Sequence, residues 1–314
     1  MDKLPLKHVV TVNERGSAIR AVRFNFDGEY CMTCGSDKSV KLWNPYKNIL
    51  LKTYSGHGYE VLDCASSTDN SRLASCSADK TVVLWDVATG QVVRKYRGHL
   101  GRVNCVKFNS PDSSVILSGS YDATVRCWDC RSRSLEPIQI IDDAKDSISS
   151  LQVTENEILT GSVDSYSRIY DIRKGQLRED CMGESITSIS ITNDGQCILA
   201  SLLASSIKLI DKDNGSVLNS FEGHVNKEYK VDSCVSSNDT HVMSGSEDGC
   251  IYFWDLIEAK VVTKTVDAHK GVVYSMSKHP EKNSILTAAT DGVKLWTCNE
   301  DEIKDDEQQG IKST

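Results

Sequence analysis

The spacing of the tryptophans constrains the fold of this 314-residue chain more than any other feature. The five Trp residues stand at positions 43, 85, 128, 254 and 296, so the successive gaps are 42, 43, 126 and 42 residues. The long gap equals three short ones, and Tyr170 and Ile210 occupy the two missing places, which gives intervals of 42, 40 and 44 residues. The sequence therefore indicates seven repeated units, each a supersecondary structure that packs on its neighbours.

Each unit carries more than its anchor residue. An Asp stands six residues before the anchor in five units, and five residues before it in the last: Asp37, Asp79, Asp122, Asp164, Asp248 and Asp291. Gly-His pairs occur at 56–57, 98–99 and 223–224, and Ala-His at 268–269. In unit two, short alternating runs over 61–65, 72–77 and 81–86 predict three strands after the Gly-His pair. Unit five lacks both the turn Asp and the aromatic anchor, so we expect it to be the least rigid.

This pattern resembles the WD40-repeat family, and the resemblance extends over nearly the whole chain. It implies an all-β fold, a seven-bladed WD40 β-propeller with four strands in each blade. In that family a loop His, a strand Ser or Thr, the turn Asp and the Trp form one hydrogen-bond chain. Three sets match it here: His57, Ser75, Asp79 and Trp85; His99, Ser118, Asp122 and Trp128; and His224, Ser244, Asp248 and Trp254. We interpret these residues as structural and not as catalytic.

The two ends of the chain predict how such a ring closes. No fourth strand follows Trp296, whereas the segment 8–12 aligns with 92–96, a fourth strand that lacks the three preceding it. We therefore expect residues 1–298 to form a single propeller in which an N-terminal strand at about 7–13 completes the last blade. Closure removes two exposed sheet edges. The acidic residues 299–314 are expected to be an unstructured tail.

Composition and motifs argue against several classes of function. The net charge of −8 makes direct nucleic-acid contact unfavourable, although a local basic patch stays possible. No apolar run is long enough to span a bilayer and no secretory signal is evident, so the twelve cysteines suggest a reducing compartment and no membrane association. The C-x-x-C pairs at 31–34 and 127–130 lack partner ligands for a metal. We found no phosphate-binding, nucleotide-binding or hydrolase motif. The chain is thus predicted to be no enzyme, with no cofactor, metal or small-molecule substrate.

Residues that depart from the repeat are candidates for binding protein partners. Exposed Tyr and Arg are frequent at the centres of interfaces, so Arg20, Tyr59, Tyr121 and Tyr274 form a candidate patch on the face that is wider in the family. The loop after His224 is two residues longer than its counterpart after His57, and Lys227, Tyr229 and Lys230 form a second candidate. The alternative is that each Tyr ring packs on its own blade with only its hydroxyl in water.

Two adjacent units end on a similar four-residue pattern. Trp128-Asp129-Cys130-Arg131 and Tyr170-Asp171-Ile172-Arg173 both read aromatic-Asp-x-Arg. They are similar to the box by which WD-repeat substrate receptors attach to cullin-RING ubiquitin ligases, where the Arg contacts the adaptor. That resemblance implies ligase attachment through Arg131 and Arg173. Alternatively, each Arg pairs with a nearby carboxylate, a surface contact worth at most about 1 kcal/mol.

Segments 30–38, 54–63, 86–95 and 127–133 carry a closer resemblance. They look like the single-propeller WD scaffolds that organise the mitogen-activated protein kinase cascade. This implies a non-catalytic scaffold for proteins of the extracellular-signal-regulated kinase cascade, associated also with pre-mRNA splicing proteins, and hence present in cytoplasm and nucleus. Two alternatives stay open: a stoichiometric structural subunit of the spliceosome only, and a substrate receptor of a cullin-RING ligase.

Overall fold

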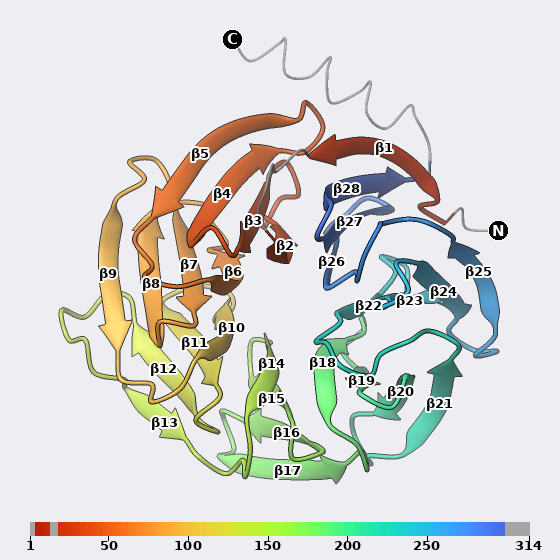
Figure 1. The fold of residues 1–314 in the computed structure, drawn as a ribbon. Coiled ribbons are helices and arrows are strands. Elements are labelled where there is room, and N and C mark those ends of the chain that lie inside the picture. The colour runs from red at the N-terminus through yellow and green to blue at the C-terminus, as the bar shows by residue number, and fades with distance from the viewer. Residues whose placement is uncertain (1–3, 13–17, 299–314) are drawn as a thin grey trace.

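Seven four-stranded antiparallel sheets are arranged in a ring (Figure 1). Their inner strands line cavities along the axis of the ring, which we call the channel. The structure is a computed structural model that describes residues 4–12 and 18–298. These residues form 28 strands and no helix, so none of them provides a helix that could cross a membrane. The seven-bladed, all-β prediction is confirmed.

The blades follow one another in chain order, each from an inner strand to an outer one. Blade one contains β2 (Ile19–Phe24), β3 (Cys31–Gly35), β4 (Ser39–Asn44) and β5 (Ile49–Ser55). Blade two contains β6 (Val61–Ser66), β7 (Arg72–Ser77), β8 (Thr81–Asp86) and β9 (Val92–Arg97). Blade three contains β10 (Val103–Phe108), β11 (Val115–Ser120), β12 (Val125–Asp129) and β13 (Gln139–Ile141). Blade four contains β14 (Ile148–Val153), β15 (Glu157–Ser162), β16 (Tyr166–Asp171) and β17 (Gln176–Cys181).

The last three blades complete the ring. Blade five contains β18 (Ile186–Ile191), β19 (Cys197–Leu202), β20 (Ser206–Asp211) and β21 (Val217–Glu222). Blade six contains β22 (Ser233–Val235), β23 (His241–Gly245), β24 (Ile251–Asp255) and β25 (Val261–Thr265). Blade seven contains β26 (Ser275–Lys278), β27 (Ser284–Ala289) and β28 (Gly292–Thr297), and its outer strand is β1 (Lys7–Val12).

The N-terminal strand therefore closes the ring as expected. β1 runs antiparallel to β28, from Lys7 opposite Thr297 to Val12 opposite Val293. The side chain of Val12 is fully buried in a cluster that joins blade seven to blade one. Position 13 and the expected tail at 299–314 lie outside the described residues.

The core is divided among the contacts between neighbouring blades. Seven clusters of buried apolar side chains each join two adjacent blades, for example blades two and three through Leu84, Tyr96 and Ile116. The anchors keep one register, since Trp128 lies opposite Ile116, Tyr170 opposite Ile158 and Ile210 opposite Ile198. Tyr170 and Ile210 thus replace Trp as the sequence spacing predicted, and blade five has all four of its strands.

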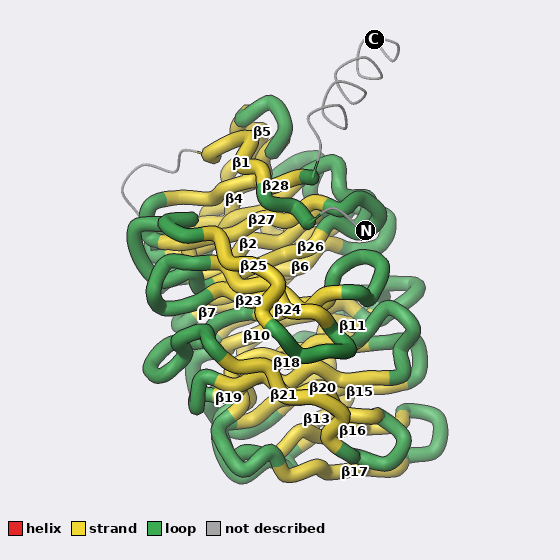
Figure 2. Tube along the Cα trace, turned by 90° about the vertical axis from the view of Figure 1, so that its right-hand side faces the viewer, coloured by secondary structure: helices red, strands yellow, loops and turns green. Residues whose placement is uncertain are grey.

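Loops gather on the two faces of the ring, at the ends of the strands (Figure 2). We call one the upper face: it carries the loops that lead into each inner strand, such as 98–102, and the turns between second and third strands, such as 121–123. The lower face carries the turns that follow each inner strand and each third strand. The candidate residues therefore separate between the two faces. The Tyr patch belongs to the loops of the upper face, and Arg131 and Arg173 belong to turns of the lower face.

Candidate protein-interaction surfaces

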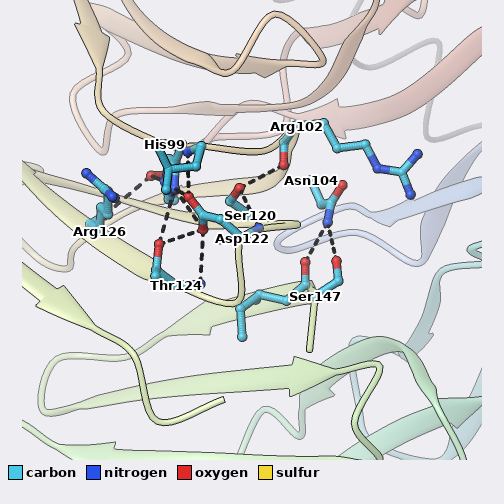
Figure 3. A network of polar contacts seen from close by, with 12 residues as sticks. His99, Arg102, Asn104, Ser120, Asp122, Thr124, Arg126 and Ser147 are labelled. Carbon is cyan, nitrogen blue, oxygen red and sulfur yellow. Dashed lines mark hydrogen bonds and ion pairs between the residues drawn. The ribbon is translucent and has the colours of Figure 1, made fainter. Parts of the chain in front are cut away.

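A hydrogen-bond chain fixes each upper-face loop of blades two and three. In blade three, His99 Nε2 lies 2.8 Å from Ser118 Oγ, and Trp128 Nε1 donates to the same oxygen at 2.9 Å. His99 Nδ1 lies 2.9 Å from Asp122 Oδ2, which also accepts the backbone N–H of Leu100 (Figure 3). The donors and acceptors of the imidazole are thereby used within the blade.

Blade two repeats this arrangement with the predicted residues. His57 lies 2.8 Å from Ser75 Oγ and 3.2 Å from Asp79 Oδ2, and Trp85 Nε1 donates to Ser75 Oγ at 2.8 Å. Burial opposes ionisation of Asp79, but hydrogen bonds from His57 and Thr81 hold the pKa of this carboxyl far below its usual range. Both sets act as structural connections between loop and strand.

The third predicted set does not form, and the prediction for blade six is wrong. Trp254 Nε1 donates to the backbone oxygen of Glu222 at 2.8 Å, and Ser244 Oγ donates to that of Gly245 at 2.9 Å. Asp248 accepts the hydroxyl of Tyr252 at 2.9 Å. Within the described residues, neither ring nitrogen of buried His224 has a hydrogen-bond partner. The phenol of Tyr252 thus occupies the acceptor that the imidazole would use.

Blade seven contains a complete set that the sequence analysis did not assemble. His269 Nδ1 lies 2.6 Å from Asp291 Oδ1 and Nε2 lies 2.8 Å from Thr287 Oγ1, to which Trp296 Nε1 also donates. The signals were present as Ala-His at 268–269 and an Asp five residues before Trp296. Because this spacing is one residue shorter than the six residues of the other units, the sequence analysis did not group the four residues into a set. The turn nevertheless accommodates the shorter spacing.

Blade four connects the same elements with an ion pair. Arg168 is almost completely buried and its guanidinium lies 2.8 Å from Asp164 Oδ2 and 2.6 Å from Glu179 Oε1. Asp164 is the turn Asp of this unit, so a strand cation takes the place of the loop His. No signal in a single sequence would have identified Arg168 for this role.

The two candidate patches meet at the upper mouth of the channel. A cavity of about 400 Å³ lies there, and its walls include Arg20, Arg102, Tyr229, Lys230 and Tyr274. The rings of Tyr229 and Tyr274 meet edge to face with their centroids 5.6 Å apart. The guanidinium of Arg20 lies 5.6 Å from the centroid of Tyr274. Four of the predicted residues, from two separate groups, therefore form one site, which we call the mouth site: Arg20, Tyr229, Lys230 and Tyr274.

Charge at the mouth site is partly compensated by nearby groups. Arg20 Nε lies 3.0 Å from Glu60 Oε2, and both side chains are about one-third exposed. Lys230 Nζ lies 3.4 Å from the backbone oxygen of Asn104, whose side-chain amide donates to Ser147 and Ile148 of the next blade (Figure 3). The mouth site therefore presents the aromatic rings of Tyr229 and Tyr274 between two cations, Arg20 and Lys230, whose positions are fixed by these contacts.

Tyr59 and Tyr121 lie beside this site and are the most exposed of the candidate rings. Their exposed fractions are 65% and 59%. The Lys38 ammonium lies 5.8 Å from the centroid of Tyr59, and the Arg102 guanidinium lies 5.4 Å from that of Tyr121. Arg102 also lines the mouth, so Tyr121 is continuous with the mouth site, whereas Tyr59 connects to it only through its neighbour Glu60. The exposed fractions argue against rings that merely pack on their own blades.

The longer loop after His224 is held by one carboxylate. Glu247 Oε1 accepts the backbone N–H groups of Lys227, Glu228 and Tyr229, at 2.8, 2.7 and 3.0 Å. Burial opposes ionisation, but these three donors lower the pKa of Glu247. The loop thereby presents Tyr229 while the side chain of Lys227 stays exposed. Sequence reasoning did not identify Glu247 as the residue that fixes this loop.

Arg131 and Arg173 lie on the lower face, in turns that follow β12 and β16 of adjacent blades. The side chain of Arg131 is 71% exposed, and its Nε lies 3.7 Å from Asp129 Oδ1. The backbone N–H of Arg173 donates to Asp171 Oδ1 at 3.0 Å, and its side chain is exposed. This surface does not overlap with the mouth site. Ligase attachment through it stays a prediction.

No group of three or more His, Cys, Asp or Glu side chains in residues 4–12 and 18–298 is arranged to hold a metal ion. The thiols of the two C-x-x-C pairs are free and buried: Cys31, Cys34, Cys127 and Cys130. They pack in the apolar clusters between blades.

Comparison with known proteins identifies the family. A family model described as "Nucleolar protein 10-like, N-terminal domain" matches residues 61–239, and one described as "WD domain, G-beta repeat" matches residues 6–44. WD repeat domain-containing protein 83 of Xenopus tropicalis is 58% identical over 291 residues, 93% of this chain and 91% of that protein. The Homo sapiens protein of that name is 54% identical over 294 residues, 94% and 93% of the two chains. A Dictyostelium discoideum homologue is 37% identical over 322 residues, 93% and 98% of the two chains. The chain belongs to the WD40-repeat β-propeller family, among the homologues of WD repeat domain-containing protein 83.

Proposed function

We propose that this protein is a non-catalytic scaffold that holds two protein partners on one rigid ring. WD40 propellers generally bind proteins. The observation that carries the proposal is the mouth site, where Tyr229, Tyr274 and Arg20 line one cavity with Tyr121 beside it. Large aromatic side chains with Arg supply most of the binding energy at many interfaces. The exposed Arg131 and Arg173 of the lower face provide a second surface that does not compete with the first.

The partners that we propose are proteins of the extracellular-signal-regulated kinase cascade and of the pre-mRNA splicing machinery. This rests on the resemblance in segments 30–38, 54–63, 86–95 and 127–133, since the names of the relatives state no partner. It implies presence in both cytoplasm and nucleus. The mechanism is proximity: two proteins held on one ring meet at an effective concentration in the millimolar range for short spans. No chemical step by this chain is required.

Quantitative affinity purification from separate cytosolic and nuclear extracts tests the proposal. The unchanged chain is compared with a Tyr121/Tyr229/Tyr274→Ala variant and with Arg131/Arg173→Ala as the matched variant of the opposite face. Each is first shown to unfold cooperatively at an unchanged urea concentration. We expect the Tyr variant to lose kinase-cascade proteins at least tenfold while the Arg variant retains them.

Other outcomes of this experiment decide between the alternatives. A stoichiometric splicing complex that both variants retain, without kinase-cascade proteins, would make the chain a structural subunit of the spliceosome and contradict the scaffold proposal. Loss of a cullin-RING adaptor from the Arg variant alone would instead identify a substrate receptor.

A further inference from the structure

The lower half of the channel contains a second cavity whose lining is unusually basic. Its volume is about 390 Å³, and it lies between the inner strands of all seven blades. Four cations line it, namely Arg23, Lys107, Lys230 and Lys278, against two carboxylates, Asp63 and Asp232. The whole chain has a net charge of −8, so this excess of positive charge is local.

Both carboxylates are already engaged by one of the cations. Arg23 Nε lies 3.0 Å from Asp63 Oδ1, and its Nη1 lies 2.8 Å from Asp232 Oδ2. Ser275 Oγ also donates to Asp232 at 2.8 Å. Burial opposes protonation of Arg23, yet the two carboxylates raise its pKa well above its usual value. This cluster joins blades one, two and six across the channel. One guanidinium and two carboxylates leave it with a single negative charge, which compensates only part of the charge of the three lysines.

Lys107 is the least compensated of these lysines. It stands near the end of β10, and its ammonium has no hydrogen-bond or ion-pair partner in the part of the chain that the structure describes. Burial, and then repulsion by Arg23, lowers its pKa, and the charges of Asp63 and Asp232 offset only part of this effect. By contrast, Lys278 Nζ contacts Asn193 Oδ1, and Lys230 Nζ has the backbone oxygen of Asn104. An anion that enters the cavity would therefore stabilise the charged form of Lys107 more than that of the other two lysines.

A hydroxyl group on the cavity wall is also without a partner. Ser190 is 8% exposed, and its Oγ has no hydrogen-bond partner among the described residues. The Oγ of Ser150 is likewise unpartnered but lies against Gly161 of the neighbouring strand β15. The amide of Gln152 lines the same wall. A buried polar group without a partner costs about 1–3 kcal/mol, so these donors favour a ligand that offers many acceptors.

We propose that this lower cavity binds a small phosphate compound, with Lys107 as its main cationic contact. Phosphate oxygens accept hydrogen bonds in several directions and carry the negative charge that the cavity lacks. A volume of about 390 Å³ exceeds the needs of one phosphate group and suits a pyrophosphate or a compact phosphate ester. The site lies on the lower side of the channel, and this inference does not rest on the proposed scaffold function.

Calorimetry and thermal unfolding of the full chain with inorganic pyrophosphate test the proposal, at an ionic strength matched with sodium chloride. We expect saturable binding and a higher unfolding temperature for the unchanged chain. Lys107→Gln should weaken binding at least tenfold, whereas Lys260→Gln, which removes a largely exposed lysine in the turn before β25, should leave it unchanged. A phosphoserine peptide distinguishes a free small compound from a phosphorylated partner.

The outcomes are separable. Without ligand, Lys107→Gln should unfold at a temperature no lower than that of the unchanged chain, because it removes an ammonium that has no hydrogen-bond partner of its own in the described part of the channel. If that variant does not fold, Ser190→Ala is expected to weaken binding several-fold. Absence of saturable binding, or equal affinity of the unchanged and Lys107→Gln chains, would overturn the proposal. Tighter binding of the phosphopeptide than of pyrophosphate would overturn the assignment to a small compound.

Discussion

Blades three and six share the same sequence motif, but the buried side chains of the motif form different hydrogen bonds in the two blades. Both have Gly-His before the inner strand, a turn Asp and a Trp six residues later. In blade three, His99 joins Asp122 to Ser118. In blade six, the Tyr252 hydroxyl donates to Asp248, and His224 is buried without a hydrogen-bond partner among the described residues. A motif thus sets the register of the strands, while competition between neighbouring donors decides which hydrogen bonds form.

The difference has an energetic consequence. A buried polar group without a partner costs about 1–3 kcal/mol, whereas a satisfied network stabilises the loop that it joins. Burial also lowers the pKa of His224 to about 4, because charging the ring there would require solvation that the site does not provide. In blade six Tyr252 stacks on Trp254, whereas in blade three a polar chain joins the loop, the turn and the strand.

Blade seven extends the comparison, because it combines a complete polar set with an outer strand from the other end of the chain. Deletion of residues 1–12 removes β1, exposes the edge of β28 and uncovers the cluster around Val12. We expect a loss of more than about 5 kcal/mol in the free energy of unfolding, measured by urea denaturation. Deletion of residues 299–314 is the control and should change it little. Equal effects would show that closure by β1 contributes no special stability.

The turn carboxylates should differ in importance between blades three and six. Asp122→Ala leaves His99, Thr124 and the N–H of Leu100 without their acceptor, so we expect a loss of about 3 kcal/mol. Asp248→Ala removes the hydrogen bonds that the Tyr252 hydroxyl and the Cys250 backbone N–H donate, and about 1 kcal/mol is expected. Urea denaturation of both variants measures the difference. Losses of equal size would mean that the two turns are equivalent.

Replacement of the histidines should have opposite signs in the two blades. His99→Leu breaks a satisfied network and is expected to cost about 2 kcal/mol. His224→Leu removes two unpartnered ring nitrogens from a buried site and should be neutral or stabilise by up to about 1 kcal/mol. Thermal unfolding under identical conditions compares them. Destabilisation by His224→Leu as large as that by His99→Leu would refute the account of blade six.

The pH dependence of stability sharpens the same contrast. The pKa of His224 is depressed on folding, so from about pH 6.5 down to about 4 the unfolded chain binds a proton that the folded chain excludes. The contribution of neutral His224 to the free energy of unfolding is therefore lost as the pH falls, by at most about 1.4 kcal/mol per pH unit. Between pH 7 and pH 5, His224→Leu should lose roughly 1–2 kcal/mol less than the unchanged chain. Parallel pH profiles in urea denaturation would contradict this.

Much of the fold follows from spacing alone. Seven anchors in phase predicted seven blades, and the leftover strand before unit one predicted closure by β1. Replacement of Trp by Tyr170 and Ile210 did not hide the repeat, because the strand register requires only a large apolar side chain at that position.

The polar contacts were less predictable, because they depend on side chains that meet only in three dimensions. Tyr252 is adjacent to Asp248 only through the geometry of the turn, and Glu179 lies opposite Arg168 only through the register of β16 and β17. The sequence named Arg20, Tyr229, Lys230 and Tyr274 as members of two groups, but that they form one mouth site depends on how the inner ends of blades one, six and seven converge. The lower cavity had no sequence signal, since Lys107 is one ordinary lysine among many.

The central claim is that this chain acts by holding two partners together, and the response to its own concentration tests that claim most directly. Phosphorylation of the terminal kinase of the proposed cascade is measured in cells as the amount of this chain is raised from far below to far above that of its partners. A scaffold predicts a rise to an optimum and then a fall, because excess chain separates the partners onto different rings. A response that rises monotonically, or that Tyr121/Tyr229/Tyr274→Ala leaves unchanged, would contradict the account.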